Sequence, residues 1–137
     1  MIRSPRVGDA GEYRFTVAAE HAIDFADHGM PAVLSTPRLI GFLERAAREA
    51  MAPLLEPHEQ TVGIHIDVEH LAATPLGLAV TCTARVIHVE GRVVTFQVQA
   101  HDEREPIARG LHKRAVIRID RFAERVRSKA KQAAPPE

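Results

Sequence analysis

Residues 36–51 read Thr-Pro-Arg-Leu-Ile-Gly-Phe-Leu-Glu-Arg-Ala-Ala-Arg-Glu-Ala-Met, and this stretch predicts one long helix. Its apolar side chains fall within one broad arc when they are projected at about 100° per residue. Thr36 stands where an N-cap belongs, Pro37 suits the first helical position, and Pro53 ends the segment. Glu44 projects at the margin of the apolar arc, so its carboxylate points partly toward the surface on which the helix packs.

Strand patterns lie on both sides of this helix. Residues 13–17 and 62–70 alternate between apolar and polar side chains, and His70 falls in phase with the apolar set of its strand. A turn at Glu90 and Gly91 joins two later strands into a hairpin, and Gly110 marks a bulge in the last strand. These later strands are expected at residues 78–89, 92–100 and 107–119.

Two segments lack such patterns. Residues 20–34 mix apolar stretches with glycine and proline and predict a loop that acts as a lid. Residues 121–137 are basic and end Ala-Ala-Pro-Pro-Glu, which predicts a short surface helix that frays at its end.

One strand, one long helix and four further strands predict an α+β fold, in which a five-stranded antiparallel sheet wraps around the helix. This arrangement is the hotdog architecture. At 137 residues, the chain is expected to form a single domain over residues 1–137. The open sheet edges and the exposed side of the helix predict a homodimer.

The composition excludes several classes of protein. With 45% hydrophobic and 26% charged residues, the chain has the composition of a soluble globular protein. A formal net charge of zero and 4% aromatic residues argue against nucleic-acid binding. No apolar run is long enough to span a membrane or to form a signal peptide. Cys82 is the only cysteine, so we expect a cytoplasmic protein without disulfides.

Three side chains are candidates for catalysis. His70 is a titratable group on the buried register of a strand, although a lone histidine there is more often a core residue. Glu44 would become a base or nucleophile if it were desolvated, although a carboxylate at a helix margin is usually solvated. Thr36 offers a hydroxyl to a substrate oxygen, although its simplest role is to cap the helix.

Gly63 and Arg114 are candidates for binding. Gly63 interrupts a strand, where glycine marks either a bulge or a close backbone approach, and its N–H suits an oxyanion. The guanidinium group of Arg114 is suited to binding a phosphate or a carboxylate, although an arginine on a strand is usually a surface charge.

A metal site is not expected. His65, Asp67 and Glu69 share one face, but same-face neighbours on a strand lie about 6.6 Å apart, too far to converge on one ion. Cys82 lies inside a strand and is expected to be a buried structural thiol.

Six blocks of the sequence, taken together, resemble the fluoroacetyl-CoA thioesterase family of hotdog proteins. The resemblance implies hydrolysis of an acyl-CoA by Thr36, Glu44 and His70, with Gly63 and Arg114 contacting the substrate. It implies no cofactor, because coenzyme A is part of the substrate. Met30 stands where the family has an aromatic lid residue, which leaves the acyl group open, and Arg45 also replaces an aromatic. The six blocks are residues 35–44, 50–57, 72–78, 89–92, 100–102 and 112–117.

Our hypothesis makes His70 a general base or transient nucleophile, with Glu44 polarising it or attacking the carbonyl itself. Thr36 and the Gly63 N–H would hold the substrate or the oxyanion. Eight residues of helix place Thr36 about 12 Å from Glu44. Thr36 is therefore expected either in a loop folded over the site or across a dimer interface from its partners.

Two other functions are compatible with the same fold. One is a protein that binds acyl-CoA without hydrolysing it. The other is a dehydratase, which is disfavoured because the sequence has no distinct His-Asp helix signature. Within thioesterases, the sequence supports a housekeeping enzyme for a short or medium acyl-CoA at least as well as an enzyme for fluoroacetyl-CoA.

Overall fold

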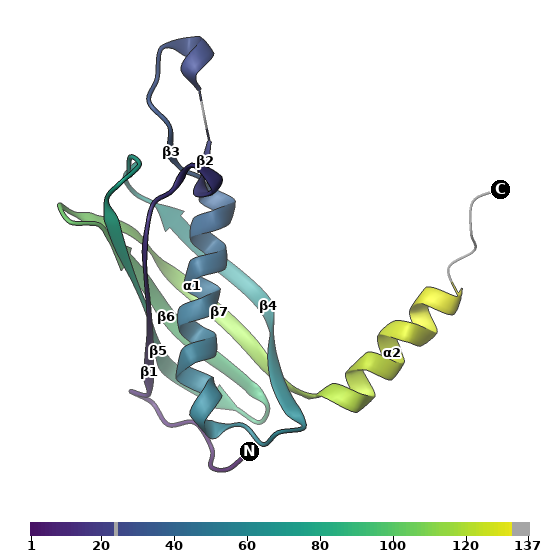
Figure 1. Cartoon of the computed structure of the whole chain (residues 1–137). Helices are drawn as coiled ribbons and strands as arrows, with labels where there is room; N and C mark the ends of the chain where they lie inside the picture. Colours follow the sequence, from purple (N-terminus) through teal and green to yellow (C-terminus); the bar gives the residue numbers. More distant parts are fainter. Residues whose placement is uncertain (24, 133–137) are drawn as a thin grey trace.

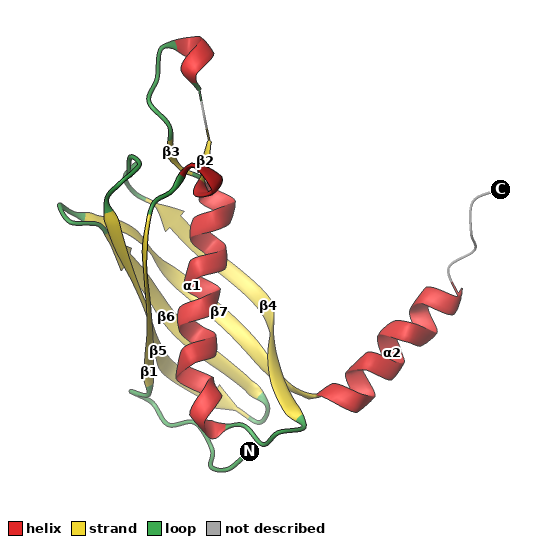
Figure 2. Cartoon of the chain, in the orientation of Figure 1, coloured by secondary structure: helices red, strands yellow, loops and turns green. Residues whose placement is uncertain are grey.

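The computed structural model describes residues 1–23 and 25–132 of the chain. Figures 1 and 2 show a curled sheet, a long helix across it and a second helix at the C-terminal end. The main elements are β1 (Ala10–Thr16), α1 (Thr36–Met51), β4 (Glu59–His70), β5 (Ala79–Glu90), β6 (Val93–His101), β7 (Pro106–Arg118) and α2 (Ile119–Gln132). The short elements are η1 (Ala19–His21), β2 (Ala22–Ile23), η2 (Ala26–His28), β3 (Val33–Leu34) and η3 (Ala52–Leu54).

The five long strands form one sheet in the order β1-β5-β6-β7-β4, and every neighbouring pair is antiparallel. The helix α1 lies across one face of this sheet (Figure 1). Its buried residues pack into a core with the inward side chains of β5 and β6. The expected α+β hotdog fold is therefore confirmed, and β1 and β4 are its two edge strands.

The start of α1 corrects one prediction. Ser35, not Thr36, is the N-cap, and its side chain accepts a hydrogen bond of 3.3 Å from the backbone N–H of Arg38. Serine and threonine are both good caps, so the sequence does not choose between two adjacent hydroxyl residues. As a result, the hydroxyl of Thr36 is released from capping.

A bulge in β4 determines which of its side chains face α1. Gly63 pairs with Arg114, but His65 pairs with Lys113, so Ile64 is inserted between them. Paired residues of antiparallel strands project to the same side of the sheet. Gly63 therefore shares the side of Arg114, and beyond the bulge His70 shares it too. Without the inserted residue, an odd and an even position would face opposite sides.

The same bulge breaks the single apolar face predicted for residues 62–70. Ile64 and Ile66 are 53% and 40% exposed. They lie on an edge strand of which only one side is paired, and α1 covers little of it. An edge with exposed isoleucines is a surface suited to pairing with another chain.

The bulge predicted at Gly110 is wrong, because β4 and β7 keep a regular register there. A Cβ at this position would clash with the backbone carbonyl of Asp67. Gly110 is thus required by the close approach of two strands, which gives the same sequence signal as a bulge.

The remaining predictions concern the two irregular segments. The segment 20–34 includes a small antiparallel pair, β2 with β3, and two 3₁₀ turns, so it is more ordered than the predicted loop. The basic tail forms α2, which has no buried residue and projects away from the sheet (Figure 1). The predicted fraying falls at residues 133–137, outside the described residues. No described helix has the length and apolar character needed to span a membrane.

Candidate functional site

Thr36 and His70 meet where α1 begins and β4 ends. The Oγ1 atom of Thr36 lies 2.8 Å from Nδ1 of His70, which is hydrogen-bonding distance. The N–H of Leu34 donates to the carbonyl of Thr74 at 2.8 Å and fixes the chain before α1 to the turn after β4. This tether explains how two residues so far apart in the sequence are brought together.

The two ring nitrogens of His70 differ in their surroundings. Its Nε2 atom is buried and has no hydrogen-bond partner among residues 1–23 and 25–132. Burial lowers the pKa of His70 below its ordinary value, and the backbone of Ala72 opposes this effect weakly. The ring is therefore biased toward the neutral form, which is able to accept a proton.

A hollow of about 380 Å³ opens beside this pair. Thr36 and His70 contribute its polar atoms, and most of its other lining side chains are apolar. Such a lining suits a small acyl group with one reacting carbonyl. The apolar lining residues are Ile23, Phe25, Val33, Leu34, Leu71, Ala72 and Ala73.

A second group of polar side chains lies on the same side of the sheet, centred on Arg114. This arginine is only 4% exposed. Its Nη1 donates to Oε2 of Glu44 at 3.1 Å, while Nε and Nη2 donate to the side chain and the carbonyl of Thr61, each at 2.9 Å. Arg114 is therefore not a surface charge, because its fork is bound and holds the carboxylate of Glu44 in place.

His112 belongs to this second group and was not among the predicted site residues. It is 1% exposed, its Nδ1 lies 2.8 Å from the carbonyl of His65, and its Nε2 lies 3.1 Å from Nη1 of Arg114. Burial, assisted by the charge of Arg114, lowers the pKa of His112. A neutral ring thus donates through Nδ1 and accepts through Nε2. The available signal was its position two residues before Arg114, on the same face of the strand.

Gly63 allows Glu44 to reach this group. A Cβ at position 63 would lie 2.5 Å from Oε2 of Glu44 and 3.2 Å from Cε1 of His112. Both interpretations of this glycine hold, because it adjoins the bulge and also permits a close approach. A hollow of about 270 Å³ at this point is lined by Glu44, Gly63 and His112 together with residues 64–66 and Ile40.

The three predicted catalytic side chains do not converge within one chain. Thr36 and His70 are in contact, but Glu44 lies eight residues further along α1, about 12 Å away by helical rise. No hydrogen bond or ion pair joins the two groups in the part of the chain that the structure describes. The prediction of Thr36 in a folded-back loop is wrong, since Thr36 opens the helix.

The model of the fluoroacetyl-CoA-specific thioesterase family matches residues 17–120. The chain belongs to this family. The fluoroacetyl-CoA thioesterase of Streptantibioticus cattleyicolor is 41% identical over 132 residues, which cover 90% of this chain and 94% of that protein. The expected resemblance is confirmed.

Solved structures agree with the family assignment. A structure of a fluoroacetyl-CoA thioesterase is 39% identical, covers 93% of this chain and 98% of its own, and superposes with a TM-score of 0.85. A variant of such an enzyme, solved with fluoroacetate and CoA, is 40% identical with a TM-score of 0.79, over 86% and 99% of the two chains. A hot-dog-like protein from Thermanaerovibrio acidaminovorans is 26% identical with a TM-score of 0.78, over 94% of each chain.

Two positions at which the sequence is expected to depart from the thioesterase family lie outside the polar groups. Met30 is 49% exposed in the segment between η2 and β3. Arg45 turns toward β1, where its guanidinium lies 4.7 Å from the ring centroid of Tyr13. Neither side chain touches Thr36, His70 or Glu44 through a hydrogen bond or ion pair, so both departures leave the candidate thioesterase residues intact.

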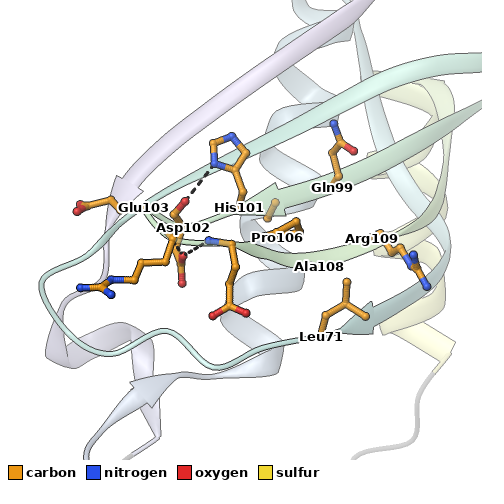
Figure 3. A pocket seen from close by; sticks show the side chains of 11 residues that line it. Leu71, Gln99, His101, Asp102, Glu103, Pro106, Ala108 and Arg109 are labelled. Carbon is orange, nitrogen blue, oxygen red and sulfur yellow. Dashed lines mark hydrogen bonds between the residues drawn. The ribbon is translucent and has the colours of Figure 1, made fainter.

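A larger hollow does not contain these candidate thioesterase residues. It measures about 610 Å³ and lies around the loop between β6 and β7 (Figure 3). Carboxylates of Asp102, Glu103 and Glu105 take part in its lining. Cys82 is no alternative nucleophile either, since burial raises the pKa of its thiol to about 12.

Proposed function

We propose that this protein hydrolyses a short acyl-CoA thioester to the free acid and coenzyme A, with the fluoroacetyl group as one possible acyl group. The observation that carries the proposal is the Thr36–His70 pair, which lines an apolar hollow and whose imidazole has no hydrogen-bond partner at Nε2 among the described residues. Family membership supports the same class of reaction. The chemistry needs no cofactor, because coenzyme A is part of the substrate.

The proposed mechanism uses His70 as general base. Neutral His70 takes a proton from water, whose oxygen forms a bond to the thioester carbonyl carbon. The tetrahedral intermediate then collapses, the C–S bond breaks, and the thiolate leaves with the proton held by the imidazole. Thr36 fixes the orientation of the ring through Nδ1. In the tautomer that acts as base, Nδ1–H donates to the threonine oxygen and Nε2 carries the lone pair. Atoms balance, since one water is added across the C–S bond.

Glu44, Gly63 and Arg114 are assigned to the other side of the reacting carbonyl. The N–H of Gly63, next to the bulge, is proposed to bind the oxyanion. Arg114 holds Glu44 and presents the carboxylate toward the hollow beside Gly63. There the carboxylate either polarises His70 or attacks the carbonyl itself. In the second case the C–S bond breaks with loss of the thiolate, and water hydrolyses the resulting anhydride to the free acid and the carboxylate of Glu44. These roles require the second group to face a Thr36–His70 pair at closer range than one chain provides.

We propose that a homodimer supplies this convergence. The edge of β4, with exposed Ile64 and Ile66, is the surface expected to pair with a second copy. Two antiparallel copies of β4 would bring His70 of the partner subunit toward the end of β4 that begins at Glu59. Glu44 of one chain would then act with Thr36 and His70 of its partner.

We propose a cytoplasmic location from the cysteine content of the chain. The only cysteine, Cys82, is buried and unpaired, so nothing in its chemistry calls for an oxidising compartment.

The proposal is tested by thiol release from a panel of acyl-CoA thioesters, with acetyl, fluoroacetyl and longer acyl groups. Wild-type protein is compared with His70→Ala and with His88→Ala, which removes an exposed histidine of β5. Turnover of a short acyl-CoA that is lost only in His70→Ala supports hydrolysis.

Two outcomes overturn the proposal. Binding of acyl-CoA without thiol release in every case identifies a non-catalytic binding protein. Hydration of an enoyl-CoA without free thiol identifies a dehydratase.

A further inference from the structure

Another hollow, between the end of β7 and α2, is lined by basic and apolar side chains. It measures about 220 Å³ and is distinct from the hollows at His70 and at Glu44. Among the residues that the structure describes, no carboxylate lines it. Its lining residues are Arg92, Val116, Ile117, Arg118, Arg121, Phe122 and Arg125.

The positive charge of these four arginines is only partly compensated. Arg118 contacts Asp120 at 3.3 Å, and Arg92 lies 3.8 Å from Glu59. Glu59, however, is already held by the N-terminal amine of Met1 at 2.8 Å. Two of the four guanidinium groups are therefore paired, one of them with a carboxylate that is shared.

The other two arginines, on α2, lack such partners. Within residues 1–23 and 25–132, no ion pair reaches Arg121 or Arg125, which stand one helical turn apart. In addition, Nε of Arg118 is buried and has no hydrogen-bond partner among these described residues. A buried donor without an acceptor is costly, and an oxygen of a bound anion would satisfy it.

We propose that this hollow binds the phosphate groups of the 3′-phospho-ADP end of coenzyme A. The inference rests on the proposed function and names how its substrate is held. A guanidinium group binds phosphate through two parallel N–H donors. Four guanidinium groups around one hollow therefore suit a ligand with several phosphoryl groups. A carboxylate or a neutral ligand would use only part of this donor set.

The position of the hollow fits the length of the substrate. Arg118 lies four residues beyond Arg114 on β7 and on the same face, so about 13 Å separates them along the strand. The extended pantetheine arm of coenzyme A spans such a gap between the thioester and the phosphates. The register also places Glu59 opposite Arg118, at the beginning of β4. The proposed dimer brings the partner's His70 toward this same end of β4.

The larger hollow in Figure 3 is a poorer place for phosphates. Asp102, Glu103 and Glu105 line it beside Arg104 and Arg109, so acidic groups balance or exceed the basic ones. Charge therefore distinguishes the two hollows, and it selects the arginine-lined one despite its smaller volume.

The test compares two double variants of α2 that lose the same charge. Arg121→Gln with Arg125→Gln removes two groups from the hollow, while Arg127→Gln with Lys131→Gln removes two that do not line it. No residue of α2 is buried, so both variants are expected to fold, which circular dichroism checks. Each is assayed with the best acyl-CoA of the panel, with its 3′-dephospho form and with the matching acyl-pantetheine.

The expected result is a KM for acyl-CoA raised about tenfold in the first variant, with kcat unchanged. A smaller rise is expected with the dephospho substrate and none with acyl-pantetheine, and the control variant keeps the wild-type KM throughout. Equal KM values for all three proteins with acyl-CoA, or an equal rise with acyl-pantetheine, would overturn the proposal.

A binding measurement separates this proposal from the hydrolytic function. Adenosine 3′,5′-bisphosphate, titrated calorimetrically, is expected to bind wild type and control alike and the first variant about tenfold more weakly. This result supports the phosphate site even if no thioester is hydrolysed. If inorganic phosphate binds as tightly as the bisphosphate and KM is unaffected by the substitutions, the hollow binds a free anion and the coenzyme A proposal fails.

Discussion

The hydroxyl of Thr36 lies 2.8 Å from Nδ1 of His70, and this contact joins the first residue of α1 to the last residue of β4. It exists because Ser35 caps the helix, which leaves the threonine hydroxyl free. The imidazole is thus held through one nitrogen, while the other has no hydrogen-bond partner in the described part of the chain. A base that is oriented and neutral is the arrangement that proton transfer requires.

Removing the hydroxyl of Thr36 tests this arrangement. Thr36→Val keeps the branched shape but leaves His70 without its partner, and kcat/KM for acyl-CoA is expected to fall about 10²-fold. Thr36→Ser restores a hydroxyl and is expected to retain most activity. The melting temperature reports whether the fold is unchanged. If Thr36→Val stays within about twofold of wild type, the pair has no catalytic role.

The pH dependence of activity follows from the lowered pKa of His70. A general base must be neutral, and burial keeps this imidazole neutral to lower pH than the ordinary value of 6.5. The acidic limb of kcat/KM is therefore expected to have its midpoint below pH 6.5, with activity lost as the pH falls through it. A midpoint at or above 6.5 in the measured profile contradicts His70 as the base.

Gly63→Ala is expected to separate activity from stability. The new Cβ meets the end of a flexible side chain, Oε2 of Glu44, so the carboxylate moves while the strands stay paired. A displacement of this size is expected to reduce kcat/KM about 10²-fold.

Gly41→Ala is the matched control for Gly63→Ala. This exposed position of α1 has no atom within 4 Å of the added Cβ. The substitution should raise stability by about 0.5–1 kcal/mol and leave activity unchanged. Full activity of Gly63→Ala would show that the position of Glu44 is immaterial.

Complementation tests the shared site. His70→Ala and Glu44→Ala homodimers should each be inactive, but a mixed dimer would hold one site with both residues intact. Random mixing at equal amounts is expected to restore about a quarter of the wild-type rate, because half the dimers are mixed and each has one intact site of two. Absence of rescue, with mixed dimers verified by differently tagged chains, would place each complete site within a single chain.

The pH dependence of stability reports on the two buried histidines. Burial lowers the pKa of both His70 and His112, so the unfolded chain, near 6.5, binds protons that the folded chain does not. The free energy of unfolding is therefore expected to fall as the pH decreases from about 6.5 toward the folded pKa values. Carboxylates with lowered pKa values, such as Asp9 and Asp102, act in a separate window below their ordinary pKa of 3.8.

Urea unfolding at several pH values between about 7.5 and 5 measures this dependence. His112→Gln removes one of the two groups, so the slope of free energy against pH should decrease while that of a His88→Gln control is unchanged. A wild-type free energy that is constant over this range would contradict the lowered pKa values.

Local patterns were sufficient for the fold but not for the details of the site. Helical periodicity located α1, and the alternation of side chains located the strands, because both report on one segment at a time. The phase of β4 was mistaken, since the inserted Ile64 reverses the alternation and is visible only in the register with β7. The role of His112 was missed for a related reason, because a buried histidine looks the same in sequence as an exposed one.

The sequence by itself determined that one apolar helix packs on a five-stranded antiparallel sheet. Its resemblance to the fluoroacetyl-CoA thioesterase family supplied the candidate site residues. Only the tertiary structure decided which of them meet. Thr36 contacts His70, while Glu44 contacts Arg114 and lies apart from them. The physical reason is that secondary structure follows from neighbouring residues, whereas a hydrogen bond between distant residues depends on strand register, bulges and caps that the whole fold sets together.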